Sequence, residues 1–279
     1  MMQQSDRGRG SHFGRSEDLR GGERMVQSTA PSPFTELNER SREIFRLIVD
    51  GYVIPEDVSL TFMRGKQNAV DVLTGSNKDE ANFGLCPGAG GRGGGPGLTA
   101  ETFKANAQRK FGDAAGEFAK LYPVTADTEA QPAAHVACAD EINWNMRQWA
   151  VAQAAKGKKA YTYFFSHVQN VNGQPSPQGA THTAELSFVF NNPKGQPTQT
   201  WNEFDTRLGD MMSSYWVNFI TKGDPNGIGL RPWPAMKELA KSKVMILSDV
   251  PKAEDVVPAQ KLTVFDSAYA RLMSANSTN

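Results

Sequence analysis

The sequence predicts an α/β protein in which a mostly parallel sheet is flanked by helices. Short runs rich in β-branched and aromatic residues alternate along the chain with longer segments of helical hydrophobic period. At 279 residues and 39% hydrophobic, the chain is long enough for one large domain or two small ones. No internal repeat is visible, so an α/β architecture is preferred to a repeat fold.

Three segments have the composition of β-strands. Residues 69–73 are β-rich and lead into Thr-Gly-Ser-Asn at 74–77, which predicts a turn after the strand. Residues 161–165, Tyr-Thr-Tyr-Phe-Phe, combine β-branched and aromatic side chains before a polar loop. Residues 243–247 predict one more strand near the C-terminus.

The helical segments repeat apolar residues at three- and four-residue spacing, which places them on one helix face. The first segment divides at Gly112 and Asp113, and the fourth helix is followed by Gly223, where glycine commonly ends a helix. The third helix has four apolar residues on one face: Ile142, Met146, Trp149 and Ala152. The predicted helices cover residues 103–111, 114–121, 142–152, 204–222 and 259–274.

The composition divides the chain into two parts. Residues 1–33 are rich in Gly, Arg, Ser and Gln and lack apolar periodicity, which predicts a disordered tail. Residues 34–279 have the pattern of a globular domain. An arginine–glycine tail can hold RNA, but the acidic residues of this tail dilute its charge.

The charge balance narrows the expected partners. Thirty basic and thirty acidic residues give a formal net charge of zero, which argues against nucleic acid and anionic membranes. The sequence contains no run of about 18 apolar residues, so no membrane span is predicted. The first ten residues also lack the apolar core of a signal peptide. Localisation stays open. Cys86 and Cys138 allow at most one bridge, and their pairing also stays open.

Three candidate ligand motifs do not meet their structural requirements, so we expect no cofactor and no metal. The Gly-x-Gly-x-x-Gly at 88–93 follows a proline and continues into more glycine instead of opening a helix, which predicts a flexible loop. Asp-Pro-Asn-Gly at 224–227 lacks the later ligands of a calcium loop and predicts a turn. The four histidines lack the paired spacing of zinc sites.

Two loops carry residues suited to chemistry. The acidic loop at 73–83 contains Glu80 and follows a predicted strand, at the sheet edge where open α/β proteins place functional groups. The loop at 178–190 contains His182 just before an apolar segment. Taken singly, Glu80 also fits a solvated turn carboxylate and His182 a satisfied loop histidine.

Six sequence blocks stand out along the chain: Val49-Asp-Gly-Tyr-Val-Ile-Pro-Glu, Gly75-Ser-Asn-Lys-Asp-Glu, Gly179-Ala-Thr-His-Thr-Ala-Glu-Leu, Tyr215-Trp-Val-Asn-Phe, Thr221-Lys-Gly-Asp-Pro-Asn-Gly and Trp233-Pro. They resemble, in the family's order, the type-B carboxylesterase family of α/β-hydrolases, which includes cholinesterase-like and p-nitrobenzyl-esterase-like enzymes. Glu80 precedes His182 as the acid precedes the histidine in the α/β-hydrolase triad. The resemblance covers about the C-terminal half of a family member and implies an incomplete α/β-hydrolase fold.

The resemblance implies a serine ester hydrolase. Glu80 matches the triad acid that orients the imidazole, and His182 matches the general base and acid. Ala81 stands where the family usually has glycine, a departure that leaves the carboxylate in place. Glu185 has no triad role to transfer, and we expect it to form a structural salt bridge.

The sequence lacks the family's nucleophile motif. No Gly-x-Ser-x-Gly and no His-Gly-Gly oxyanion segment occurs in the 279 residues. We therefore expect a C-terminal fragment of a carboxylesterase, produced by a truncated gene, a partial assembly or a frameshifted start. We expect this fragment to be inactive alone. It would act on small carboxylic esters only when the missing half complements it. The alternatives are a catalytically dead cholinesterase-like binding or adhesion module and an α/β fragment without activity.

Overall fold

A computed structural model describes the central part of the chain, namely residues 49–56, 58–80, 97–193, 200–237 and 242–276. Within these residues, one sheet has four strands in the order β1-β2-β5-β6. The first three are parallel, and β6 pairs antiparallel with β5, so the prediction of a mostly parallel sheet is confirmed. The strands are β1 Val72–Asn77, β2 Ala160–Phe165, β5 Val244–Leu247 and β6 Lys252–Glu254.

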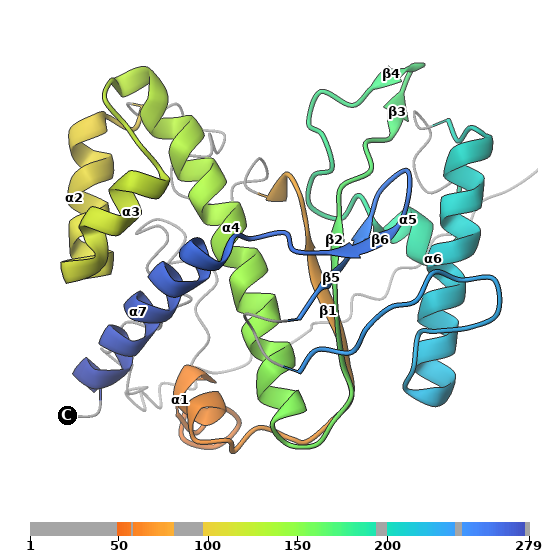
Figure 1. Ribbon diagram of the computed structural model, residues 1–279, viewed down its shortest axis with the longest axis horizontal. Coiled ribbons are helices and arrows are strands. Elements are labelled where there is room, and N and C mark those ends of the chain that lie inside the picture. Colours follow the sequence, from red (N-terminus) through yellow and green to blue (C-terminus); the bar gives the residue numbers. More distant parts are fainter. Residues whose placement is uncertain (1–48, 57, 81–96, 194–199, 238–241, 277–279) are drawn as a thin grey trace, which may run out of the picture.

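Helices cover both faces of this sheet (Figure 1). The long helix α4 packs on one face, where Ala150 joins Val72 and Ala160 in a small apolar cluster. Helix α6 covers the other face, where its apolar side chains join those of β2 and β5 in a second cluster. Successive β2 residues point to opposite faces, so both faces are buried. The helices are α1 Val58–Met63, α2 Ala100–Phe111, α3 Ala115–Leu121, α4 Asp127–Ala154, α5 Leu186–Val189, α6 Glu203–Lys222 and α7 Ala259–Asn276, with a 3₁₀ turn at Gly112–Ala114 and a hairpin of β3 Asn170–Val171 and β4 Gln174–Pro175.

Strand β1 lies further along the chain than predicted. It begins at Val72, so residues 69–71 of the predicted strand lie outside it, and the polar sequence at 74–77 forms its last four residues instead of a turn. Parallel pairing with β2 explains the difference, since Gly75 lies opposite Tyr163. A Cβ at Gly75 would be 2.3 Å from the Tyr163 carbonyl oxygen, so only glycine allows the two backbones to approach this closely.

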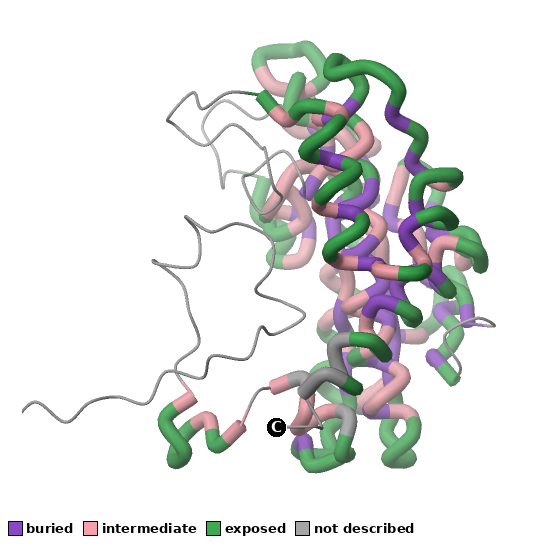
Figure 2. The backbone as a smooth tube through the Cα atoms, turned by 90° about the vertical axis from the view of Figure 1, so that its left-hand side faces the viewer, coloured by how far each residue is buried: buried purple, intermediate pink, exposed green. Residues whose placement is uncertain are grey.

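Helix α4 begins earlier than the apolar pattern predicted. It starts at Asp127, where Glu129 accepts hydrogen bonds from the backbone N–H groups of Thr125 and Ala126. The predicted face is also wrong: Trp149 is exposed, whereas Asn143 and Arg147 are buried. The Arg147 guanidinium donates to the Ser242 carbonyl, and this distant partner explains how a charged residue lies on the inner face. Figure 2 shows the same burial along the whole backbone: buried residues gather in the middle of the molecule, and exposed residues lie on its outside.

The other predicted helices and strands agree with the structure. The α2–α3 pair divides at Gly112, and α6 ends at Gly223, which has the left-handed conformation with φ 67°. The turn predicted at 224–227 lies further along the chain, where the Leu230 N–H donates to the Gly227 carbonyl at 3.2 Å, while Asp224 Oδ1 accepts the Asn226 N–H in the segment just before it. Of the aromatic side chains near the sheet, Phe188 is fully buried and Phe190 is 75% exposed.

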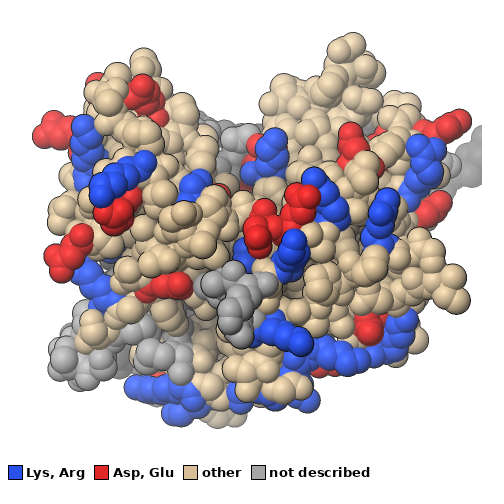
Figure 3. Space-filling view, viewed as in Figure 1, with Lys and Arg blue, Asp and Glu red and all other residues tan. Residues whose placement is uncertain are grey.

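Several sequence predictions fall outside the described residues, including the tail at 1–33, the glycine-rich loop at 88–93 and Cys86. Cys138 is disulfide-bonded. Acidic and basic side chains are interspersed over much of the face in Figure 3, while Lys and Arg gather along its lower edge. In the part of the chain that the structure describes, no helix is both long and apolar enough to span a bilayer.

Candidate active site

Glu80 lies just beyond the carboxyl end of β1. The turn after Asn77 brings its carboxylate back to the strand, where Oε1 accepts the Asn77 backbone N–H at 3.1 Å. Only 8% of Glu80 is exposed. The acidic loop therefore holds a buried, hydrogen-bonded carboxylate and not a solvated one.

His182 lies in a series of turns between β4 and α5. Its Nδ1 is 2.7 Å from Glu80 Oε2, although the two residues are 102 positions apart in the sequence. The side chain is 40% exposed, so one part of the ring contacts the carboxylate while another reaches the surface. The structure thus places the two candidate residues in direct contact.

The hydrogen bond determines which nitrogen of His182 carries the proton. An ionised carboxylate only accepts, so the donor to Glu80 Oε2 is Nδ1–H. In the neutral imidazole, Nε2 then has the lone pair. This arrangement leaves Nε2 as the atom that can accept a proton from a reacting group.

The backbone holds the two loops together. Asp79 N–H donates to the Ala180 carbonyl at 3.0 Å, and Ala180 N–H donates to Asp79 Oδ2 at 2.8 Å. Gly179 has φ +71°, and a Cβ there would lie 2.1 Å from Asp79 Oδ2. Glycine is therefore needed both for its backbone conformation and for the space that Asp79 occupies.

Asn77 links the end of β1 to both sides of His182. Its Nδ2 donates to the Thr181 carbonyl at 2.8 Å and to Glu185 Oε2 at 2.5 Å. The partner of Glu185 is therefore an amide and not the cation expected from the sequence. Asn77 had no predicted role from the sequence, although this residue lies in the block Gly75-Ser-Asn-Lys-Asp-Glu that resembles the family.

Tyr163 of β2 lies beside these carboxylates. Burial, followed by the negative charges of Glu185 and Glu80, raises the pKa of its phenol well above the usual value. The neutral ring also packs edge-on against Trp216 of α6, at 5.3 Å between centroids. The side chains of Tyr163 and Trp216 thus pack against the site on the side of α6.

Among the residues that the structure describes, no group of three or more His, Cys, Asp or Glu side chains could hold a metal ion. The contact between the buried carboxylate of Glu80 and the partly exposed ring of His182 is suited to moving a proton.

Comparison with known proteins identifies the family. The sequence profile described as "Carboxylesterase family" matches residues 22–265. The chain belongs to this family. The mostly parallel sheet flanked by helices is consistent with the family's α/β-hydrolase fold.

Shorter segments match individual relatives. Identity is 39% over 88 residues with Carboxylesterase 5A of Mus musculus, 37% over 82 residues with Acetylcholinesterase of Gallus gallus and 38% over 72 residues with Bile salt-activated lipase of Homo sapiens. These segments cover 29%, 29% and 26% of this chain. They amount to only 15%, 11% and 9% of the relatives, so the chain matches a small part of their length.

Proposed function

We propose that this chain provides the acid and the histidine of a serine carboxylic ester hydrolase. The observation that carries the proposal is the 2.7 Å contact between His182 Nδ1 and Glu80 Oε2 at the carboxyl edge of the sheet. Membership of the carboxylesterase family supports ester hydrolysis as the reaction.

In the proposed mechanism, His182 moves the proton. Nε2 accepts it from a serine hydroxyl as the oxygen attacks the acyl carbon, and then gives it to the departing alkoxide. In the second half of the reaction, Nε2 accepts a proton from the water that attacks the acyl-enzyme carbonyl carbon, and returns it to the serine oxygen as the bond between the acyl group and serine breaks and the acid leaves. Glu80 holds the ring in the required tautomer and stabilises the imidazolium that forms.

The nucleophile comes from a segment that this sequence does not contain. A Gly-x-Ser-x-Gly turn exposes the serine in α/β-hydrolases, and the 279 residues have no such motif. We therefore propose that the chain is a fragment with negligible activity alone, and that its substrate is a small carboxylic ester bound together with a complementing segment.

Ester hydrolysis by the chain alone and by a mixture tests this proposal. The full chain is purified, checked for folding by circular dichroism and assayed with p-nitrophenyl acetate and butyrate. It is then mixed with the part of a carboxylesterase-family protein that carries Gly-x-Ser-x-Gly. We expect hydrolysis only in the mixture.

A second mixture serves as the positive control, since the same nucleophile segment combined with its own C-terminal part shows that the segment is competent. If that control is active and the mixture with this chain forms a complex without hydrolysis, the enzyme proposal is wrong. A binding module would then be the better description.

A further inference from the structure

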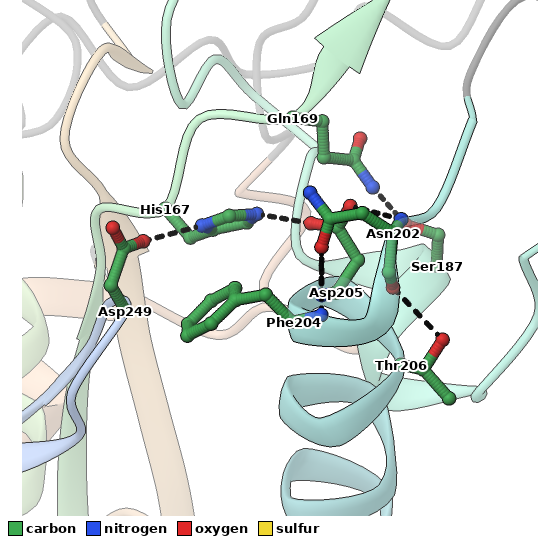
Figure 4. Close-up of polar contacts among 8 residues, drawn as sticks. All are labelled: His167, Gln169, Ser187, Asn202, Phe204, Asp205, Thr206 and Asp249. Atoms are coloured by element: carbon green, nitrogen blue, oxygen red, sulfur yellow. Dashed lines mark hydrogen bonds and ion pairs between the residues drawn. The ribbon is translucent and has the colours of Figure 1, made fainter.

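A second histidine lies at the same edge of the sheet as the candidate site. His167 follows the carboxyl end of β2, the strand between β1 and β5, and only 7% of it is exposed. Its ring lies between two carboxylates (Figure 4): Nε2 is 2.6 Å from Asp205 Oδ1 and Nδ1 is 2.9 Å from Asp249 Oδ1. Both ring nitrogens of His167 therefore face a carboxylate oxygen.

This ring joins the ends of three separate elements. Asp249 follows β5, and Asp205 lies in the first turn of α6. Asp205 is 1% exposed, and its second oxygen accepts the Asn202 N–H at 2.9 Å as part of the cap of α6. Both Asp205 oxygens are therefore in use, which fixes the carboxylate that orients His167.

His167 also contacts the segment that follows His182. Its ring packs edge-on against Phe188 of α5, with 5.3 Å between centroids, and Phe188 is fully buried. Next to this contact, Gln169 Nε2 donates to Ser187 Oγ at 2.9 Å. His167 and Gln169, two positions apart after β2, thus anchor the adjacent residues Phe188 and Ser187 of α5.

Consecutive turns connect this anchor to His182. Backbone hydrogen bonds join Ala184 N–H to Thr181 O, Leu186 N–H to Thr183 O and Phe188 N–H to Glu185 O. The segment from 181 to 188 therefore has little backbone freedom once both of its ends are held. Asp79 holds one end through Ala180, and the contacts with His167 and Gln169 hold the other.

We propose that His167 is a positioning residue that fixes the orientation of His182 toward Glu80. It acts through Phe188 and α5, and Asp205 and Asp249 hold its ring in place. This inference rests on the proposed function, because that proposal is what gives the His182–Glu80 contact its catalytic meaning. His167 itself transfers no proton in this account.

The test is the proton NMR signal of the His182 Nδ1–H that is hydrogen-bonded to Glu80, recorded on the full chain labelled with ¹⁵N. The signal is assigned by its loss in His182→Gln. We expect His167→Phe to fold and to lose or broaden this signal, because phenylalanine keeps the packing on Phe188 but has no donor for either carboxylate. The matched control is His135→Phe on α4, whose ring contacts Gln131, and it should keep the signal.

Asp205→Asn provides a second test if His167→Phe does not fold. The amide keeps the shape of the side chain but replaces one of the two carboxylate oxygens that contact His167 and the Asn202 N–H, so the ring loses its fixed carboxylate and the His182 signal should again be lost or broadened. If a folded His167→Phe or Asp205→Asn keeps the signal of the unaltered chain, the positioning role is wrong. Absence of the signal from the unaltered chain would instead contradict the His182–Glu80 contact and with it the proposed function.

Discussion

Asp79 and Ala180 exchange two hydrogen bonds, one between backbone groups at 3.0 Å and one from the Ala180 N–H to the Asp79 carboxylate at 2.8 Å. This double contact lies immediately before Glu80 in one loop and just before His182 in the other. These two hydrogen bonds therefore set the relative position of the loops that carry Glu80 and His182.

Replacing Gly179 by alanine tests the fit between these loops. The variant must adopt a positive φ and also displace Asp79 Oδ2, which lies 2.1 Å from the new Cβ. Gly173→Ala is the matched control, because φ is +78° there and nothing lies within 4 Å of the Cβ. We expect the control to lower the free energy of unfolding by about 1–2 kcal/mol, the cost of the backbone conformation alone. Gly179→Ala should lower it by more, measured by urea denaturation, and equal losses would contradict the contact.

Gly75→Ala tests the close approach of β1 to β2. Its Cβ would meet the backbone oxygen of Tyr163, so the strands must separate, and we expect a loss of about 1–3 kcal/mol in the free energy of unfolding. The control is Gly116→Ala in α3, where nothing lies within 4 Å. That change should be neutral or stabilising by up to about 1 kcal/mol. A Gly75→Ala protein as stable as the original would show that the strands are further apart than described.

Glu80→Gln removes the negative charge beside His182 but keeps the size of the side chain. In the complemented enzyme we expect kcat for p-nitrophenyl butyrate to fall by about 10⁴-fold, since an amide at this position favours the wrong tautomer of the histidine. Glu203→Gln, at an exposed carboxylate on α6, is the control and should leave kcat unchanged. An equal kcat for Glu80→Gln and the unaltered chain would remove Glu80 from the mechanism.

Asp224 gives a prediction for the pH dependence of stability. Its pKa is lowered from the ordinary value of 3.8, first by the hydrogen bond from the Asn226 backbone and also by the nearby Lys159 and Lys222. A carboxylate with a lowered pKa in the folded state stabilises the fold above the ordinary value, and this stabilisation is lost as the pH falls through the folded pKa. We expect urea unfolding at pH 7 down to pH 3 to show a steeper loss of stability for the unaltered chain than for Asp224→Asn, which keeps the acceptor oxygen. Parallel curves would contradict the assigned role.

Elements whose signals are local were predictable from the sequence. The apolar period of α6 and the glycine at 223 determine where this helix ends, and the β-branched and aromatic run at 161–165 determines β2. The buried face of α4 was not predictable, because Arg147 is paired with a carbonyl 95 residues away. Polar residues can replace apolar ones on an inner face when distant groups satisfy them, and the hydrophobic period does not contain that information.

The candidate site shows the same division. Glu80 and His182 were recognisable from motifs and chain order. Asn77 lies in the same block as Glu80 but had no role assigned to it, and His167 belonged to no block. The partners of His167 are 38 and 82 residues away and belong to different elements, so only the folded chain reveals the cluster. Residues that act through others are harder to predict than residues that belong to a motif.

The hydrolysis of p-nitrophenyl butyrate by the complemented enzyme with His182→Ala tests the central claim most directly. The account predicts that the variant assembles with the nucleophile segment as the unaltered chain does, yet loses nearly all turnover, while His135→Ala keeps it. Full activity in His182→Ala would contradict the account, because the proton would then be moved by another group.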